Sequence, residues 1–347
     1  MERFASILEA WYADHKRELP WRETRDPYRI WISEIILQQT RVAQGEEYYR
    51  RFVERFPDVR ALAEAPEDEV MKYWQGLGYY SRARNLHAAA RSMADAGFPT
   101  DYEGVRALKG VGDYTAAAIC SFAYDMPCAV VDGNVYRVLS RYFGIDEPID
   151  STGGKKTFAA MAAELLDVRR PALYNQAIME FGALQCTPSS PACLFCPLAD
   201  GCQALATGRV GELPVKQHRT QTVDRFFHYI YIHIGGDTFI RRREASDIWR
   251  NLYELPLLEA DHRLSSEELR RRLAADWTCP NEALASLQPL QLGVKHVLSH
   301  RILYTDFYRM EWPQDALPPE GYLRIPRSGL DRYAFPRLID AFFEKNG

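Results

Sequence analysis

The sequence predicts a two-domain protein, with a mostly α-helical region followed by a smaller α+β domain. Two observations carry this prediction. Amphipathic, alanine-rich segments recur over residues 1–205, and strand-like sequence begins at Phe226. The length of 347 residues also favours two domains, and the 47% hydrophobic content is enough for a large core.

The first region, residues 1–205, is predicted to be helical because apolar side chains recur at helical spacing. RARNLHAAARSMADAG (82–97) and TAAAICSFAY (115–124) are examples, and Gly and Pro residues break such segments. The segment that follows, ATGRVGELPVKQHRTQTVD (206–224), is polar and contains both Gly and Pro. We therefore expect it to be a linker.

The second region, residues 225–347, is predicted to mix strands with helices. FFHYIYIHIGG (226–236) followed by DTFIRRR (237–243) predicts a hairpin of two strands. SSEELRRRLAADW (265–277) predicts one helix, and RILYTDFYRMEW (301–312) predicts another strand. This mixture indicates a small α+β domain.

The overall charge does not identify a partner. A net charge of -4 gives no indication of nucleic acid, so DNA binding must depend on local backbone amides and arginines. No apolar run approaches the roughly 20 residues of a membrane span. The charged start of the sequence (1–20) lacks a signal-peptide core. We expect a cytoplasmic monomer without membrane contacts.

Four of the seven cysteines lie together, at Cys186, Cys193, Cys196 and Cys202. In the cytoplasm such a group indicates metal binding and not disulfides. A structural zinc site usually has two short, separated pairs, whereas the spacing here is C-x6-C-x2-C-x5-C within one loop. The compact arrangement favours a cubane iron–sulfur cluster, with zinc as the alternative. The other three, Cys120, Cys128 and Cys279, are expected to be ordinary thiols.

A glycine pair lies between two predicted helices in ALKGVGDYTAAAI (107–119). Gly110 and Gly112 would let backbone N–H groups approach a ligand, and the next helix would present its N-terminus to an anion. A DNA phosphate would suit this position. A plain turn between helices is the alternative.

Two carboxylates are candidates for catalysis. Glu34 lies in the largely apolar segment PYRIWISEIILQQT (27–40), where burial would raise its pKa and keep it protonated. Asp132 precedes a predicted helix in CAVVDGNVYRVLSR (128–141) and would cap it in the ionised form. An acid and an ionised carboxylate form the pair that cleaves glycosidic bonds. A surface Glu and a purely structural N-cap are the alternatives.

Several segments together resemble the MutY family of adenine DNA glycosylases: LPWR (19–22), SEIILQQTRV (33–42), GLGYYSRARNL (76–86), LKGVGDYTAAAI (108–119), VDGNVYRVLSR (131–141), NQAIMEFGALQC (175–186) and the cysteine loop. The similarity covers about residues 1–205, and WRNLYELP (249–256) and VKHVLSH (294–300) resemble the C-terminal domain of that family. The resemblance implies a helix-hairpin-helix glycosylase with a [4Fe–4S] cluster and a C-terminal Nudix-like domain. It also implies removal of adenine from duplex DNA with A:8-oxoguanine or A:G mispairs.

The resemblance implies a division of the chain. A six-helix barrel is expected at about 21–126, and the cluster domain at 1–20 together with 127–205. The linker is expected at 206–224 and a lesion-recognition domain at 225–347.

The resemblance also implies roles for individual residues. Glu34 is expected to protonate adenine and Asp132 to stabilise the sugar cation or its covalent adduct, with Tyr114 and Asn134 beside the reacting nucleotide. Gln176 is expected at the adenine edge. Further DNA contacts are expected from Arg22, Gln38, Gln39, Thr40, Tyr79, Gly110 and Gly112, and lesion contacts from Leu298, Ser299 and His300. The four clustered cysteines match the cluster ligands.

Departures from the family pattern also bear on function. Leu298 stands where the family often has Phe, and Lys109 stands where Pro is usual. The glutamate-rich metal-binding run of Nudix hydrolases is absent, which indicates recognition and not hydrolysis. Without the resemblance, His300 would be an ordinary histidine at a strand end.

Other functions must be distinguished from the one that the resemblance implies. A strand-cleaving enzyme like endonuclease III would need a lysine where Tyr114 stands, since Tyr forms no Schiff base. A thymine-mismatch glycosylase would share the fold, but the expectation that Glu34 is an acid that protonates a purine argues against that function. A non-catalytic iron–sulfur DNA-binding protein would tolerate loss of either carboxylate, and a zinc module would be colourless. We therefore expect a monofunctional glycosylase.

Overall fold

The computed structural model describes residues 2–218, 222–244, 247–277, 279–316 and 319–346. The chain divides into two compact units: unit 1 comprises Met1–Ala65 and Asn85–Arg219, and unit 2 comprises Pro66–Arg84 and Thr220–Gly347. The expected linker, 206–224, contains this division, and residues 219–221 of it lie outside the described residues. Among the described residues, none of the helices combines the length and apolar character needed to span a membrane.

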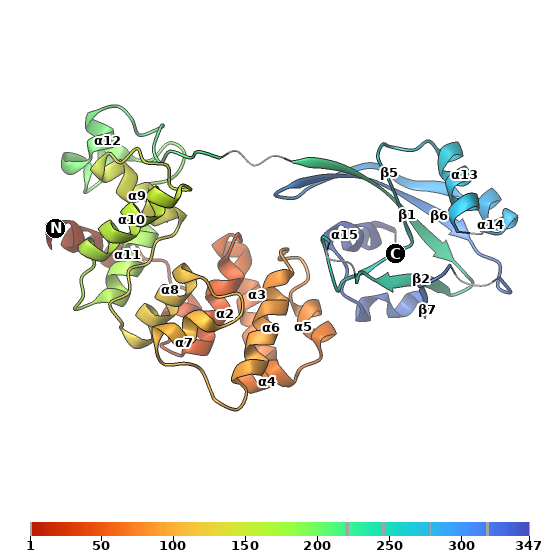
Figure 1. Cartoon of the computed structure of the whole chain (residues 1–347), viewed down its shortest axis with the longest axis horizontal. Helices are drawn as coiled ribbons and strands as arrows, with labels where there is room; N and C mark the ends of the chain where they lie inside the picture. Colours follow the sequence, from red (N-terminus) through yellow and green to blue (C-terminus); the bar gives the residue numbers. More distant parts are fainter. Residues whose placement is uncertain (1, 219–221, 245–246, 278, 317–318, 347) are drawn as a thin grey trace. The chain divides into compact units, whose positions relative to one another are not determined.

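The helical prediction for residues 1–205 is confirmed. The α-helices are α1 (Glu2–His15), α2 (Pro27–Leu37), α3 (Val42–Arg55), α4 (Val59–Glu64), α5 (Glu67–Tyr73), α6 (Ser81–Met93), α7 (Tyr102–Ala107), α8 (Asp113–Tyr124), α9 (Gly133–Phe143), α10 (Thr152–Leu165), α11 (Pro171–Leu184) and α12 (Gln203–Ala206). Short 3-10 helices occur at Pro20–Arg22, Cys193–Phe195 and Ala199–Gly201, named η1, η2 and η3 (Figure 1).

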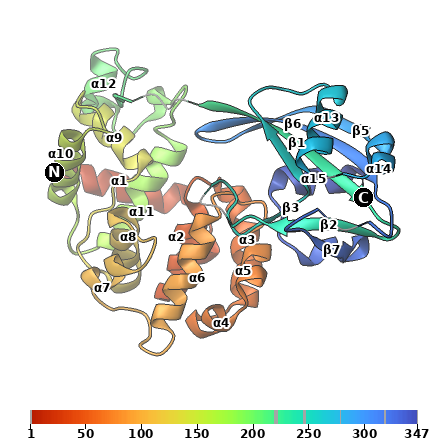
Figure 2. The same cartoon turned by 45° about the vertical axis from the view of Figure 1, so that its right-hand side comes forward.

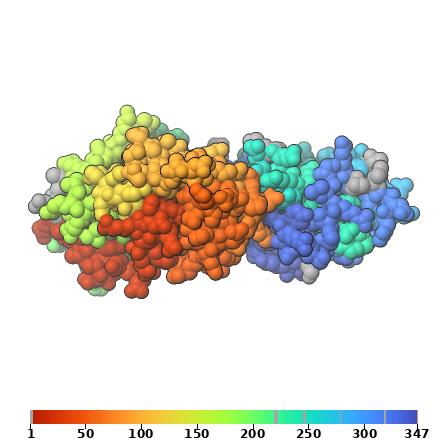
Figure 3. All heavy atoms as spheres, turned by 90° about the horizontal axis from the view of Figure 1, so that it is seen from below, coloured from red at the N-terminus to blue at the C-terminus, as the bar shows by residue number. Residues whose placement is uncertain are grey.

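The N-terminal helix packs on helices far along the sequence. α1 lies against α11, with Trp11 edge-on to Phe181 at 5.0 Å between ring centroids. The space-filling view shows red N-terminal atoms next to yellow-green atoms from the middle of the chain (Figure 3). These helices, with α9 and α10, share one hydrophobic core. The packing brings η1, which follows α1, close to α11.

Two further helices are defined by local sequence signals. α2 begins at Pro27, and the preceding Asp26 accepts a hydrogen bond from the Tyr28 N–H at 2.9 Å. α2 packs along α8, so that side chains from both helices face the same space. α9 begins after Asp132 and ends at Gly144, whose φ of 69° lies in the left-handed region that favours glycine.

Unit 2 contains two small sheets. The strands are β1 (Val223–His233), β2 (Asp237–Arg242), β3 (Tyr253–Glu254), β4 (Leu257–Ala260), β5 (Gln288–Val297), β6 (Arg301–Glu311) and β7 (Leu323–Pro326). One sheet has the order β4-β1-β6-β5 and the other β3-β2-β7. β1 and β6 run parallel, from Val223 opposite Arg301 to His233 opposite Glu311, whereas the other strand pairs are antiparallel. The predicted strand at 301–312 is confirmed.

The expected hairpin of β1 and β2 is wrong in its pairing. A tight turn does join the two strands, with one antiparallel bridge between Ile234 and Asp237. Beyond that bridge, β1 pairs with β4 and β6, and β2 pairs with β3 and β7. The reason is that β1 is buried on both faces, so distant partners supply its hydrogen bonds.

Helices cover β1 on two sides. Phe227, Tyr229 and Tyr231 belong to a core shared with α15 (Arg337–Asn346). Ile230, Ile232 and Ile234 belong to a second core, shared with α13 (Ser266–Asp276) and α14 (Asn281–Ser286). Figure 2 shows the helices α13, α14 and α15 beside the sheet that contains β1. Alternate side chains therefore enter opposite cores, as the period of a strand requires. The predicted helix at 265–277 is confirmed and starts at a capping box of Ser265 and Glu268.

The segment Pro66–Arg84 belongs to unit 2. Glu67 on α5 accepts hydrogen bonds from Arg242 (3.2 Å) and Asn251 (2.5 Å). The Tyr80 hydroxyl donates to the Phe335 carbonyl at 3.4 Å. These contacts join residues far apart in sequence, which the local pattern does not encode.

Candidate active site

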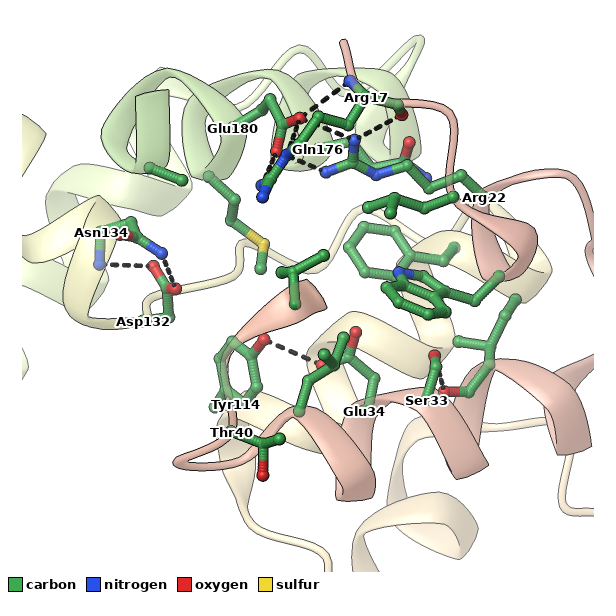
Figure 4. Close-up of a pocket in the computed structure, with 18 residues that line it drawn as sticks. Arg17, Arg22, Ser33, Glu34, Thr40, Tyr114, Asp132, Asn134, Gln176 and Glu180 are labelled. Atoms are coloured by element: carbon green, nitrogen blue, oxygen red, sulfur yellow. Dashed lines mark hydrogen bonds and ion pairs between the residues drawn. The ribbon is translucent and has the colours of Figure 1, made fainter. Parts of the chain in front are cut away.

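A cavity of about 240 Å³ opens within unit 1 between η1, α2, α8, α11 and the start of α9. Figure 4 shows that the labelled side chains come from opposite walls of this cavity. The cavity brings together seven residues that the sequence singled out: Arg22, Glu34, Thr40, Tyr114, Asp132, Asn134 and Gln176. It also contains Arg17 and Glu180, which the sequence did not single out.

Glu34 lies on the buried face of α2 and is only 6% exposed. Burial raises the pKa of its carboxyl to about 7; the Tyr114 hydrogen bond and the Arg22 charge lower it, and the Asp132 charge raises it. The expectation of a raised pKa therefore agrees with the structure. A carboxyl group with a pKa near neutral pH can donate a proton and recover it.

Tyr114, near the N-terminal end of α8, donates a hydrogen bond from its hydroxyl to Glu34 Oε2 at 2.8 Å. Burial, followed by the nearby Glu34 and Asp132 charges, raises the pKa of Tyr114 well above its ordinary value. The hydroxyl therefore stays protonated. It orients the carboxyl group without competing for its proton.

Asp132 both caps α9 and lines the cavity, so the structural and the catalytic interpretations are compatible. Its Oδ1 accepts from the backbone N–H groups of Asn134 (2.9 Å) and Val135 (2.8 Å), and its Oδ2 accepts from Asn134 Nδ2 (2.7 Å). Burial raises the pKa of Asp132, and these hydrogen bonds oppose that effect. Arg137 in turn donates to Asn134 Oδ1 at 2.8 Å, which fixes the Asn134 side chain.

Gln176 lies on α11 and is held by α1. The buried Tyr12 donates from its hydroxyl to Gln176 Oε1 at 2.7 Å. This hydrogen bond fixes the side-chain amide at the edge of the cavity. Gln176 therefore presents a fixed amide to the cavity.

The residues that follow α2 occupy different positions. Thr40 lines the cavity, whereas Gln38 and Gln39 are not among its lining residues. Gln38 donates from Nε2 to Thr115 Oγ1 at 3.2 Å, which ties the end of α2 to α8. Gln39 has φ of 58°, a left-handed conformation that is uncommon for residues other than glycine. Such strain is often found at functional sites.

The predicted glycine hairpin joins α7 to α8. Gly110 has φ of 84°, and a Cβ atom there would lie 2.7 Å from Asn85 Cβ, so glycine is required on both grounds. Gly112 is the N-cap of α8, and Lys109 is exposed beside the glycines. The hairpin therefore places two glycines, the N-terminus of α8 and the exposed Lys109 next to one another.

The comparisons with known proteins agree with this geometry. Residues 32–160 match the HhH-GPD superfamily of base excision DNA repair proteins, and residues 228–345 match a NUDIX domain. The chain is 30% identical over 305 residues to an adenine DNA glycosylase of Buchnera aphidicola, a match that covers 87% of this chain and 84% of that protein. The chain belongs to the adenine DNA glycosylase family. It is thus an adenine DNA glycosylase of base excision repair.

A mammalian relative supports the same assignment, and two solved structures are similar in fold. The mouse adenine DNA glycosylase is 42% identical over 222 residues, which cover 60% of this chain and 43% of the mouse protein. Among solved structures, a thermostable thymine-DNA glycosylase has a TM-score of 0.56 at 30% identity and covers 59% of this chain and 96% of its own. An endonuclease III–DNA complex has a TM-score of 0.52 at 22% identity, over 60% of this chain and 95% of its own, and supports the fold alone.

The residues implied in lesion recognition gather elsewhere, within unit 2 of the enzyme. A cavity of about 410 Å³ is lined by Tyr79, Leu298, Ser299 and His300, together with Trp249 and others. Tyr79 is 48% exposed and its φ is 46°; its hydroxyl contacts Ser299 Oγ. Leu298 packs partly on the hydrophobic core around Phe227. The hydroxyl groups of Tyr79 and Ser299 therefore lie in the same cavity as exposed apolar side chains.

The four clustered cysteines surround one small hollow. Cys186, Cys193, Cys196 and Cys202 all line a cavity of about 30 Å³ with Arg141. The Arg141 guanidinium donates to Cys186 Sγ at 3.4 Å and to the Thr187 carbonyl at 2.7 Å. A positive charge there would offset the negative charge of thiolates.

The four thiols therefore share one site, as a metal group held by all four would require. In the described part of the chain, no group of three or more His, Cys, Asp or Glu residues is arranged to hold a single metal ion.

Arg17 and Glu180 are charged residues of the cavity that sequence reasoning missed. A signal for Glu180 was present, because it follows Gln176 by four residues in NQAIMEFGALQC and so lies on the same helix face. Arg17 gave no comparable signal. It reaches the cavity through the packing of α1 on α11.

Proposed function

We propose that the enzyme hydrolyses the N-glycosidic bond of adenine mispaired with 8-oxoguanine or guanine, and that it does not cleave the strand. The observation that carries this proposal is the presence of Glu34 and Asp132 in one cavity, with the pKa of Glu34 raised to about 7. The pair combines a proton donor with a negative charge held beside it.

The reaction begins with extrusion of the adenine, because the target atoms are unreachable within a duplex. Flipping costs a few kcal/mol in stacking and pairing. Gln38 and Tyr79 offset part of this cost as wedges in the base stack. The amide of Gln176, fixed by Tyr12, then contacts the adenine edge.

Glu34 donates its proton to the adenine ring, with N7 as the accepting atom. The electrons of the C1′–N9 bond move to the base, which leaves as neutral adenine, and the sugar becomes an oxocarbenium ion. Asp132 stabilises this cation or its covalent adduct with its negative charge. Water supplies hydroxide to C1′, and the remaining proton returns to the Glu34 carboxylate.

The Nudix-like domain recognises the opposite base in this proposal. Ser299 and His300 supply hydrogen-bonding groups in the cavity of unit 2. Leu298 in place of Phe removes an aromatic wedge, so recognition depends more on those polar groups.

The substrate and the lack of strand cleavage are tested in one assay. Single-turnover reactions use duplexes with adenine opposite 8-oxoguanine, guanine or thymine, and thymine opposite guanine, each developed with and without alkali. We expect cleavage at adenine opposite 8-oxoguanine and guanine, and only after alkali. The thymine arm is included because a thymine-DNA glycosylase is a structural neighbour. Preferred release of thymine, or a lysine–DNA adduct trapped by borohydride, would contradict the proposal.

We also propose that Cys186, Cys193, Cys196 and Cys202 hold a [4Fe–4S] cluster. Such a group supplies a rigid cross-link between distant points of the loop, and no step of the reaction passes through it. The loop between Cys186 and Cys202 contains no Lys or Arg, so the stiffened backbone carries its contribution to DNA binding.

Replacing Cys193 with serine is expected to remove the brown colour and visible absorbance. Its first effect should be on folding or DNA affinity, and not on the chemical step. Cys128→Ser, a partly buried thiol outside the loop, is the matched control and should keep the colour. Absorbance, circular dichroism and DNA titration measure the three effects. A folded, colourless Cys193→Ser variant with unchanged DNA affinity would show that the cluster does not have this role.

A further inference from the structure

A second charged group faces Glu34 across the cavity of unit 1. Glu180, on α11, is 1% exposed and accepts hydrogen bonds from two arginines. Arg17 donates from its backbone N–H (3.0 Å), Nε (2.8 Å) and Nη2 (2.5 Å), and Arg22 donates from Nη1 (3.0 Å) and Nη2 (2.8 Å). Figure 4 shows this cluster on the wall opposite Glu34 and Tyr114.

Glu180 is buried and held by several hydrogen bonds, unlike a carboxylate in an ion pair on the surface. Burial alone would raise the pKa of Glu180, but the hydrogen bonds from Arg17 and Arg22 outweigh it and lower the pKa to about 2. Glu180 is therefore ionised at every working pH. Its charge cancels one of the two arginine charges, so the cluster as a whole carries one positive charge.

Arg22 couples this cluster to the catalytic acid. Arg22 and Glu34 line the same cavity, and the Arg22 charge lowers the pKa of Glu34. The other groups that face Glu34 are Tyr114 from α8 and Asp132 at the start of α9. Gln176 on α11 carries no charge. Glu180 is thus the group that limits the positive charge opposite Glu34.

We infer that Glu180 is a positioning residue for the reaction: it holds Arg22 at the cavity wall and cancels part of the arginine charge, so that Glu34 keeps its proton at neutral pH. This inference rests on the proposed role of Glu34 as the acid. Without the Glu180 charge, two uncompensated arginines would favour the ionised form of Glu34. Glu34 would therefore lose its proton at a lower pH than in the wild-type enzyme.

The test is the pH profile of single-turnover adenine release by Glu180→Gln. We expect the midpoint of the high-pH decline to move to lower pH by about one unit, the size of shift that a nearby opposite charge produces. The double variant Glu180→Gln with Arg22→Gln should move the midpoint back up, because it removes the uncompensated charge. A purely structural role would lower the rate equally at every pH.

Glu9→Gln is the matched control. Glu9 is also buried in unit 1 and is paired with an arginine, Arg170, at 2.5 Å, but it does not line the cavity. We expect its loss to cost stability in thermal melting and to leave the midpoint unchanged. An unchanged midpoint in Glu180→Gln would overturn the inference, while inactivity of Glu34→Gln would still support the proposed reaction.

If Glu180→Gln does not fold, Arg22→Gln alone decides the question. Removing one arginine leaves the negative Glu180 less compensated, so the midpoint should then move to higher pH. A midpoint that stays at the wild-type value would overturn the inference.

Discussion

Replacing Glu34 with glutamine is expected to lower the single-turnover rate of adenine release by about 10²–10⁴-fold, the usual contribution of general acid catalysis. Glutamine has nearly the same size, and its carbonyl oxygen can still accept the Tyr114 hydrogen bond. The substitution therefore removes the transferable proton and leaves the packing of α2 intact. Rapid-quench measurement on a duplex with adenine opposite 8-oxoguanine gives the rate.

DNA affinity is the internal control for this prediction, because Glu34 lies inside the cavity and contributes little to contacts with the duplex. Glu34→Gln should bind the mispaired duplex as wild type does in a gel-shift titration. Glu9→Gln, a buried glutamate away from the cavity, should retain its rate. Near wild-type release by Glu34→Gln would remove the proposed acid from the mechanism.

The pH dependence of the wild-type rate follows from the same group. The pKa of Glu34 is raised to about 7, so the proton-carrying form is present below that value and is lost as pH rises through it. We expect the rate to fall about tenfold per unit well above pH 7. Glu34→Gln should lack this decline, because the amide does not titrate.

Some parts of the site are encoded locally and could be predicted. Asp132 caps α9 because an aspartate before a helix accepts backbone N–H bonds, and Gly110 is required where the hairpin turns left-handed. Glu34 was identified because a carboxylate within an apolar helix is unusual, and its raised pKa follows from burial. Each of these features depends on a few neighbouring residues.

Other parts depend on packing between distant segments. The Glu180 cluster joins residues 158 to 163 positions apart, and only the contact of α1 with α11 brings them together. In the same way, β1 pairs in parallel with β6, far along the chain, in place of the neighbouring β2. Hydrophobic periodicity identifies such elements but does not identify their partners.

Replacing Asp132 with asparagine is expected to reduce adenine release by on the order of 10²–10³-fold or more, since a charge that stabilises the transition state is lost. The fold should tolerate this change. Asparagine is as good an N-cap as aspartate, so the bonds to the backbone of Asn134 and Val135 persist. The bond from Asn134 Nδ2 is lost, because the new amide nitrogen cannot accept it. The rate loss would then report the missing charge together with that bond, and not a damaged α9.

Asp101→Asn separates the two roles of Asp132. Asp101 caps α7 by accepting from the Gly104 N–H at 2.8 Å, but it lies outside the cavity. Its replacement removes one negative charge at a helix cap and should leave the rate of base release unchanged. If Asp132→Asn folded, bound the duplex and released adenine as fast as Asp101→Asn, capping would be its only role, and the sugar cation would need another source of negative charge.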